Sequence, residues 1–456
     1  MADRKQTKQK RLTAAPPKDR AAERRDLPRR AMRVMVILYL FIAGSYASTI
    51  PLGKGPDETA HVRYIESLAQ DHHLPVFDPA HPDPNYEFHQ PPLYYLLCLP
   101  VYNLSHGGDS GQQAVRFFTL LLSLPLIYLT FALGRRLAPD DPWVGVAAAS
   151  VVAFLPMQLS IATTIGNDAL TEVLAAGLLL LLISYVTAAA RHRSGEAQAP
   201  PSANAMVSAG VLMGLAMLTK SIAVLLLPVA WLAALFAARG PDGYRWRPML
   251  VRAALATGVA LIICGWWLVR NQMLYGDLLA QKAFLRAFEG LRPSPQSFMQ
   301  QFHVTSVGSY IGQVIIWTMA SATGVFGPVH GNRFAFFPYY IYLTTGVTAL
   351  VAAFGFARYL GRTKLADWQR QGWWLSGAFA LLLLGSFVRF NLSFFQAQAR
   401  YLYPVLPAAA VAYCLGLAAL FPLRWRDPIL IAASALLAAL AFAGLHAWIA
   451  PQFIAS

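Results

Sequence analysis

An acidic pair beside a histidine, in the sequence G-P-D-E-T-A-H, follows the first apolar stretch of the chain. Asp57 and Glu58 stand at the expected start of a helix, because Pro56 suits the first helical turn. On such a helix Asp57, His61 and Tyr64 share one face. A carboxylate beside a histidine can accept a proton or bind a cation. Helix capping by acidic residues is the alternative interpretation, and two carboxylates with one histidine make a weak metal site.

Two further polar segments could contact a substrate. His89 precedes Pro91 and Pro92, which enforce an extended entry to the next helix. Its imidazole could hydrogen-bond a substrate, although the tyrosines that follow could simply form an interfacial aromatic belt. Asn167 and Asp168 lie in a turn between apolar runs, where both are good turn and N-cap residues. Intramembrane acids usually face a cavity, so we also consider Asp168 a site residue.

Basic and neighbouring polar residues at the ends of apolar runs form a third group. Lys220 could hold a phosphate as a point charge, or its side chain could merely snorkel toward the membrane surface. The three arginines could bind a phosphate bidentately or pair with carboxylates. One of the arginines, Arg389, could also simply flank an apolar run. The residues of this group are Lys220, Arg270, Asn271, Arg389, Arg400 and Tyr401.

The composition identifies the setting of these residues. Of the 456 residues, 56% are hydrophobic and 13% are charged, whereas soluble proteins have about 25% charged residues. This excludes a soluble multidomain enzyme and a disordered chain. A spanning helix needs about 20 apolar residues, and runs of nearly that length predict an all-α polytopic membrane protein with about eleven transmembrane helices. The runs are 34–51, 114–134, 143–163, 169–190, 205–219, 221–238, 251–269, 339–357, 372–390, 401–421 and 428–449. The pair 205–219 and 221–238 is short, so a re-entrant hairpin is an alternative there.

The net charge of +15 is distributed unevenly. Residues 1–33 hold twelve Lys and Arg, which predicts a disordered basic cytoplasmic tail with affinity for anionic lipid rather than for nucleic acid. With this tail inside, 26 of the 37 basic residues lie on the inner side, as the positive-inside rule requires. Residues 34–456 then form a single transmembrane domain with two large outer loops, 51–113 and 270–338, whose mixed segments suit interfacial helices.

Several familiar motifs are missing from the sequence. It contains no Walker loop, no G-x-G-x-x-G, no H-E-x-x-H and no G-x-S-x-G. Nucleotide-driven transport and serine or zinc-dependent hydrolysis therefore have no motif support.

The ordered motifs resemble those of the GT-C superfamily of polytopic membrane glycosyltransferases. The chain has P-D-E-x-x-H in the first outer loop, then Q-P-P-L-Y-Y, N-D-A-L, L-T-K, W-x-x-R-N and finally Q-x-R-Y-L-x-P. This order and sidedness resemble the protein O-mannosyltransferases and the lipid A aminoarabinose transferase, and most closely bacterial members with the P-D-E-x-x-H loop. The resemblance covers about residues 32–420 and implies a GT-C fold.

The resemblance also implies an activity. Its members transfer a sugar with inversion from a polyprenyl-phosphate donor to an acceptor hydroxyl at the outer face of the membrane. The family's catalytic base corresponds to Asp57, with Glu58 adjacent, and its second outer acid corresponds to Asp168. A divalent cation, Mg or Mn, could bind Asp57 and Asp168 if one is used. The substrate- and donor-binding candidates are His61, His89, Asn167, Asp168, Lys220, Arg270, Asn271, Arg400 and Tyr401.

The expected location is the bacterial cytoplasmic membrane, with the amino terminus in the cytoplasm and the active site facing outward. The expected partners are a polyprenyl-phosphate-linked sugar, the lipid bilayer and an acceptor that could be a glycan, a lipid or a protein, with no nucleic acid. A polymerase or ligase of lipid-linked oligosaccharides is one alternative. A transporter or flippase is another, but it would need charges deep within the spans, and the sequence has almost none.

Overall fold

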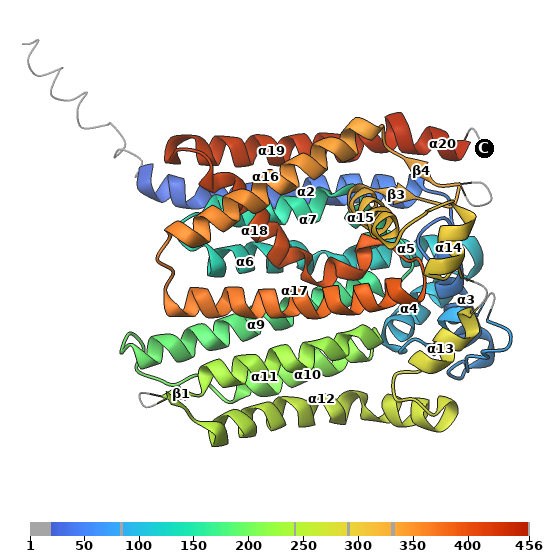
Figure 1. Ribbon diagram of the computed structural model, residues 1–456, viewed down its shortest axis with the longest axis horizontal. Coiled ribbons are helices and arrows are strands. Elements are labelled where there is room, and N and C mark those ends of the chain that lie inside the picture. Colours follow the sequence, from blue (N-terminus) through green and yellow to red (C-terminus); the bar gives the residue numbers. More distant parts are fainter. Residues whose placement is uncertain (1–19, 83–84, 241–242, 290–291, 330–332, 455–456) are drawn as a thin grey trace, which may run out of the picture.

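The computed structural model describes residues 20–82, 85–240, 243–289, 292–329 and 333–454. Within them the protein is helical except for two short antiparallel hairpins, which confirms the all-α prediction. In one hairpin β1 (Arg239–Gly240) pairs with β2 (Gly243–Tyr244), and in the other β3 (Val325–Phe326) pairs with β4 (Ala335–Phe336). Most long helices run side by side along one direction (Figure 1), as expected of a bundle that crosses a bilayer.

Each of the eleven apolar runs is helical, but the helices differ in length. The long helices are α2 (Arg20–Thr49), α5 (Gly108–Ser123), α6 (Pro125–Leu137), α7 (Pro142–Phe154), α9 (Asp168–Arg193), α10 (Asn204–Met217), α11 (Leu226–Ala237), α12 (Trp246–Tyr275), α15 (Val307–Thr323), α16 (Tyr339–Arg362), α17 (Asp367–Ser393), α18 (Leu406–Ala419) and α19 (Leu423–Gly444). The shorter ones are α3 (Glu58–Asp71), η1 (Tyr86–His89), α4 (Leu93–Leu104), α8 (Pro156–Ala162), η2 (Ser221–Leu225), α13 (Gln281–Phe288), α14 (Pro295–Gln301), η3 (Ala399–Val405), η4 (Leu445–Ile449) and α20 (Ala450–Ile454).

The number of spans is smaller than the expected eleven. In the described parts of the chain, eight helical segments are long and apolar enough to cross a membrane, and a ninth results if α7 and α8 count together. Those two helices meet at an angle of 63° because the chain turns at Leu155, before Pro156. The helices α10 and α11 fall below the length of a span, since Lys220 between them has an extended backbone. Both nevertheless lie beside α9 and α12 (Figure 1).

The expected amino-terminal tail is only partly described. Residues 1–19 lie outside the described residues, and α2 begins at Arg20. The helix therefore includes the last part of the segment 1–33.

The two large loops lie at one end of the bundle, which we call the site end. Helices α3, α4, α13 and α14 cluster there, whereas β1 and the turn from α16 to α17 lie at the opposite end (Figure 1). Helix α9 occupies the middle of the bundle and contacts α5, α6, α10, α11 and α17. The first turn of α9 reaches the site end and begins with Asp168, so a largely buried helix carries a site residue.

Helices α16 and α18 pack closely through two glycines. A methyl group added at Gly416 would overlap the carbonyl of Ala352, and one added at Gly355 would overlap the carbonyl of Gly416. Small residues are the usual means by which membrane helices approach each other. We therefore expect Gly416→Ala to lower stability by about 1–3 kcal/mol, as overpacking does, measured as the thermal unfolding midpoint in detergent. Gly385→Ala on α17 is the control, because open space surrounds Gly385; equal midpoints for the two variants would contradict this prediction.

Candidate functional site

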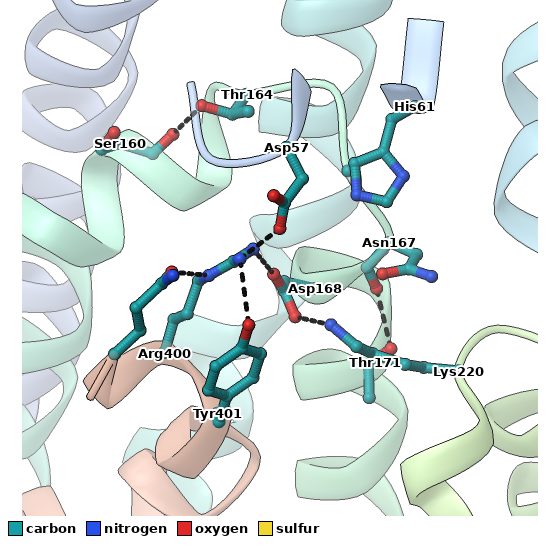
Figure 2. A network of polar contacts seen from close by, with 12 residues as sticks. Asp57, His61, Ser160, Thr164, Asn167, Asp168, Thr171, Lys220, Arg400 and Tyr401 are labelled. Atoms are coloured by element: carbon teal, nitrogen blue, oxygen red, sulfur yellow. Dashed lines mark hydrogen bonds and ion pairs between the residues drawn. The ribbon is translucent and has the colours of Figure 1, made fainter. Parts of the chain in front are cut away.

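Four charged side chains from distant parts of the sequence meet at the site end. Arg400 donates to a carboxylate oxygen of Asp57 and, over 3.1 Å, to Asp168, and Lys220 donates to the other oxygen of Asp168 (Figure 2). Arg400 is only 3% exposed. Desolvated charges are stable only when paired with good geometry, so this network of two carboxylates and two cations fixes the site. The sequence proposed all four residues, and the structure brings them together.

Each of the four charged residues lies at or next to the end of a helix. Asp57 precedes α3, Asp168 begins α9, Lys220 lies in the break between α10 and η2, and Arg400 lies in η3. Arg400 is further fixed by Gln398, which accepts a hydrogen bond from its Nε at 2.7 Å. Helix ends leave backbone groups and side chains free to face a cavity, which explains why the charges gather where apolar runs stop.

The backbone at Asp57 is in the left-handed region, with φ 55° and ψ 14°. Such a conformation is uncommon outside glycine, although Asp and Asn tolerate it best, and it persists only where the surroundings enforce it. The side chain is held by Arg400 and by Tyr86, whose hydroxyl donates to Oδ1 at 2.9 Å. The geometry thus directs this carboxylate toward Arg400.

Glu58 serves a different structural purpose from its neighbour. Arg116, which is 1% exposed, donates to both oxygens of the Glu58 carboxylate at 2.6 and 2.7 Å. Glu58 also accepts from the backbone N–H groups of Gly55 at 3.0 Å and Ile165 at 3.2 Å. Arg116 additionally donates to the carbonyls of Ala47, Ile50 and Pro51. This buried pair therefore joins the end of α2, the start of α3, helix α5 and the turn before α9.

The electrostatics keep Asp57 ionised. Burial alone would raise the pKa of the Asp57 carboxyl, but the charge and hydrogen bond of Arg400, with the Tyr86 hydroxyl, hold the pKa well below its usual range. Burial, followed by the nearby Asp57 charge, raises the pKa of Tyr86. Tyr86 therefore stays protonated and can donate to Asp57.

A cavity of about 390 Å³ opens beside the four charges, within the range of small-molecule sites. Its polar wall includes Asp57, Asp168, Lys220 and Arg400 together with His61, Tyr86, Glu87, His89, Gln90 and Tyr401. Its apolar wall includes Ile222, Leu225, Phe284, Phe288, Leu383, Phe387, Phe390 and Phe394. Arg292 and Arg389 also line it, and neither forms an ion pair within the described part of the chain. The cavity is therefore suited to an amphipathic anion.

The histidines of the cavity wall are buried and held by hydrogen bonds. The Nδ1 of His61 bonds with the Tyr95 hydroxyl at 2.8 Å. The Nδ1 of His89 donates to the Tyr86 carbonyl at 2.7 Å, and its Nε2 accepts from the Gln90 amide at 3.3 Å. Burial lowers the pKa of His61, and it lowers the pKa of His89 to about 4. Both rings are thus neutral near pH 7, and both nitrogens of His89 already have partners.

Four proposed residues lie outside the cavity wall. Glu58 pairs with Arg116, and Asn167 donates from its amide to the Thr219 carbonyl at 3.1 Å. Arg270 donates to the Pro75 carbonyl at 2.7 Å and lies over the Trp267 ring, and Asn271 donates to the Leu278 carbonyl at 3.2 Å. These contacts tie loops to helix ends next to the site.

Three cavity residues that bear on the function, Tyr86, Glu87 and Arg292, were not proposed from the sequence. Tyr86 bonds with Asp57 across 29 positions of sequence, so no local spacing indicates the contact. Glu87 precedes the proposed His89 by two residues, and its charge within an apolar-aromatic stretch was the only signal available. A buried acid so close to a proposed site residue was the feature to follow.

The two carboxylates proposed for a divalent cation are engaged by basic side chains in this structure. Among the described residues, no group of three or more His, Cys, Asp or Glu side chains could hold a metal ion. The two carboxylates proposed for a cation, Asp57 and Asp168, are both already paired with Arg400, and Asp168 also with Lys220. Two carboxylates directed at a guanidinium are a poor ligand set.

Solved structures share this arrangement of helices. The oligosaccharyltransferase of Archaeoglobus fulgidus, tethered to an acceptor peptide with an NVT sequon, matches with a TM-score of 0.53 and 17% identity, over 93% of this chain and 54% of that one. The same protein in complex with Zn and sulfate gives 0.51 and 17%, over 92% and 52%. The ArnT of Cupriavidus metallidurans in the apo state gives 0.48 and 20%, over 90% and 64%. The chain thus spans about half the length of the oligosaccharyltransferase.

These findings define the class of the protein. It is an integral membrane protein with the GT-C type of fold, which confirms the fold that the resemblance implied. The family model described as dolichyl-phosphate-mannose-protein mannosyltransferase matches residues 89–267, a segment that carries His89, Asp168 and Lys220. Comparison with curated proteins gives no match.

Proposed function

We propose that the protein transfers a sugar from a polyprenyl-phosphate donor to an acceptor hydroxyl, with inversion, in the cavity at the site end. The observation that carries this proposal is the buried network of Asp57, Arg400 and Asp168 at a cavity that is also lined by apolar and aromatic side chains. The family model that matches residues 89–267 is named for a prenyl-phosphate sugar donor, which supports the same chemistry.

The reaction needs few chemical groups. The acceptor oxygen attacks the anomeric carbon while the bond from that carbon to the phosphate oxygen breaks, and this single displacement inverts the configuration. The phosphate leaves as a stable anion, so no general acid is needed. Asp57, ionised and aimed into the cavity, holds the acceptor hydroxyl and takes its proton as the new bond forms. One carboxylate suffices, in contrast to the paired acids of glycoside hydrolases.

The donor has an anionic and an apolar part, and the cavity offers a surface for each. Charge develops on the phosphate in the transition state, and fixed cations stabilise it. Arg292 and Arg389 are the cavity cations without an acidic partner among the described residues, so we assign the phosphate to them rather than to Arg400, which is fully paired. The phenylalanines of the cavity wall would accept the first prenyl units. Two of them, Phe284 and Phe390, are in aromatic contact.

The membrane setting follows from the charge distribution. Fourteen of the 37 basic residues lie in the loops expected on the inner side, which include β1 and the turn from α16 to α17 at the end opposite the site, against eleven on the expected outer side. Positive residues favour the cytoplasmic side. We therefore place the site outside the cytoplasmic membrane of a bacterium. Nucleotide sugars are absent there, which makes a lipid-borne donor necessary. The acceptor would be a glycan, a lipid or a protein.

Transfer of radiolabel is the direct test of the proposed function. Membranes containing the protein, and membranes from the same host without it, would receive a panel of polyprenyl-phosphate sugars, each with and without EDTA. We expect transfer from at least one donor only where the protein is present, and the EDTA samples decide whether a divalent cation takes part. Uptake of donor into proteoliposomes without any glycosylated product would contradict the proposal and favour transport.

Arg389→Ala should weaken binding of the donor without removing the base. A hydrogen bond to a charged group contributes about 1.5–3 kcal/mol, so the donor KM should rise by about tenfold or more, whereas the acceptor KM should stay unchanged. Steady-state kinetics at several donor concentrations measure this effect. Arg370→Ala is the matched control, because Arg370 lies near the opposite end of α17 and pairs with exposed Asp367. Equal donor KM values for the two variants would remove Arg389 from the phosphate site.

A further inference from the structure

Glu87 lines the cavity, and one oxygen of its carboxyl group is unpaired. The residue lies in η1 and is 6% exposed, and its Oε2 is buried without a hydrogen-bond partner among the described residues. It also lines the same cavity as Asp57. A buried acceptor without a partner is costly, so a folded protein retains one where a ligand supplies the missing partner.

The cations of the site cannot be the missing partner. Lys220 is held by Asp168, and Arg400 is held by Asp57 and Asp168. Among the described residues no basic side chain forms an ion pair with Glu87. Asp57 and Asp168 are therefore paired with cations of the site, whereas Glu87 is left for a ligand.

The turn that carries Glu87 is rigid. The Tyr86 hydroxyl is fixed by Asp57, and the Tyr86 carbonyl is fixed by His89. The backbone N–H of Gln90 donates to the Glu87 carbonyl at 2.9 Å. The carboxyl group is thus preorganised between residues that already contact the reaction centre, which reduces the cost of binding.

His61 is a second polar residue of the same cavity wall. Both line the cavity, and Glu87 is the charge with the largest effect on the His61 ring. The Nδ1 of His61 is engaged by Tyr95, and its other ring nitrogen forms no hydrogen bond within the part of the chain that the structure describes. The same cavity wall therefore carries a carboxyl group and an imidazole nitrogen.

We propose that Glu87, with His61, forms a subsite that binds a hydroxyl group of a sugar ring and thereby selects the sugar. This inference rests on the proposed function and adds a specificity-determining residue to it. The sugar is either the ring carried by the lipid phosphate or a ring of the acceptor, because both present the same hydroxyl chemistry to this wall.

The chemistry of the pair suits a neutral polyol. Burial raises the pKa of the Glu87 carboxyl, and the His61 ring and the Asp57 charge modify this effect in opposite directions. A carboxyl group with a raised pKa can both donate to and accept from a hydroxyl. A site built to bond a hydroxyl discriminates strongly against a ligand that lacks it, because the polar groups of the site would then be left unpaired.

The kinetic test compares sugars and variants of the full-length protein in nanodiscs. The donors are prenyl phosphates of glucose, mannose and galactose; mannose and galactose each differ from glucose in the orientation of one hydroxyl. We expect Glu87→Ala to raise the KM for the preferred donor about tenfold and to bring the kcat/KM values of the three donors closer together. Glu87→Gln, whose amide group can also both accept and donate, should stay within about threefold of the wild type. If the effect falls on the acceptor KM alone, the subsite binds the acceptor ring.

Two results would overturn this assignment. One is an equal loss by Glu87→Ala for all three donors with the original preference retained. The other is unchanged kinetics in that variant. Glu66→Ala is the matched control, since Glu66 lies on α3 outside the cavity wall and pairs with exposed Arg63; it should keep wild-type kinetics.

A binding measurement separates this inference from the proposed function. Thermal unfolding would be followed with a sugar-bearing prenyl phosphate and with the same prenyl phosphate without a sugar. The wild type should be stabilised more by the sugar-bearing lipid, and Glu87→Ala should lose this difference while retaining stabilisation by the bare lipid. If the sugar-bearing lipid stabilises both proteins more than the bare lipid does, and by the same margin, the subsite is contradicted. The measurement reports binding, so its result does not depend on whether transfer occurs. Without lipid the variant should be as stable as the wild type, because it removes an unpaired buried carboxyl.

Discussion

Asp57→Asn is expected to lower kcat for sugar transfer by about 10²- to 10⁴-fold, the usual contribution of a positioned base, while the protein remains folded. The asparagine amide retains one oxygen for Arg400 but cannot take up a proton from the acceptor. Because Asn shares with Asp the tolerance for left-handed backbone, the φ of 55° at this position persists in the variant. The measurement is single-turnover transfer of labelled sugar, with the thermal unfolding midpoint as the test of folding.

Asp71→Asn provides the control for this prediction. Asp71 ends the same helix α3, is exposed and accepts a hydrogen bond only from Ser67 nearby, so its variant should transfer at the wild-type rate. Full activity in Asp57→Asn would remove Asp57 from the mechanism. Loss of activity together with loss of folding would assign the residue to structure, since Asp57 also neutralises buried Arg400.

The fold was largely predictable because the bilayer restricts the possible structures. Each apolar run was expected to form a helix, because outside a closed barrel only a helix pairs all backbone N–H and C=O groups in lipid. Each run is helical in the structure. The number of spans was less predictable. Apolar length alone does not show that the chain turns before Pro156 or that Lys220 interrupts a helix. These interruptions depend on tertiary contacts such as the bond from Lys220 to Asp168.

The site was predictable where a charge interrupted an apolar pattern. Asp57, Asp168, Lys220 and Arg400 all stand out in this way, and all four meet in one network. Their pairing was not predictable, because Asp57 and Arg400 are 343 residues apart.

Neighbouring residues with the same chemistry could not be told apart from the sequence. Asp57 and Glu58 are both acids at a helix start, yet the left-handed turn sends one to the cavity wall and the other to Arg116. The direction of each side chain depends on which residue of the folded protein pairs with it. Since Arg116 appeared in the sequence only as an arginine in an apolar run, its role as that partner became visible in the structure.

Arg116→Met should produce the largest loss of stability in this chain, about 3–5 kcal/mol, because it leaves the buried Glu58 carboxylate without a cation. Three carbonyl groups at the end of α2 would lose a donor as well. The measurement is the unfolding midpoint in detergent or in a denaturant titration. The control is Arg63→Met, because its exposed pair with Glu66 contributes less than about 1 kcal/mol.

A double variant distinguishes a specific ion pair from a general intolerance of substitution. Glu58→Gln combined with Arg116→Met removes both charges together, so it should be more stable than Arg116→Met alone, since an unpaired buried charge costs more than a neutral pair. Additive losses would show that the two side chains do not depend on each other, contrary to the 2.6 Å contact between them. Because Glu58 adjoins Asp57 and accepts from the turn before α9, transfer activity should recover with stability only in part: the neutral pair restores the packing, but it no longer fixes the left-handed turn that directs Asp57 toward Arg400.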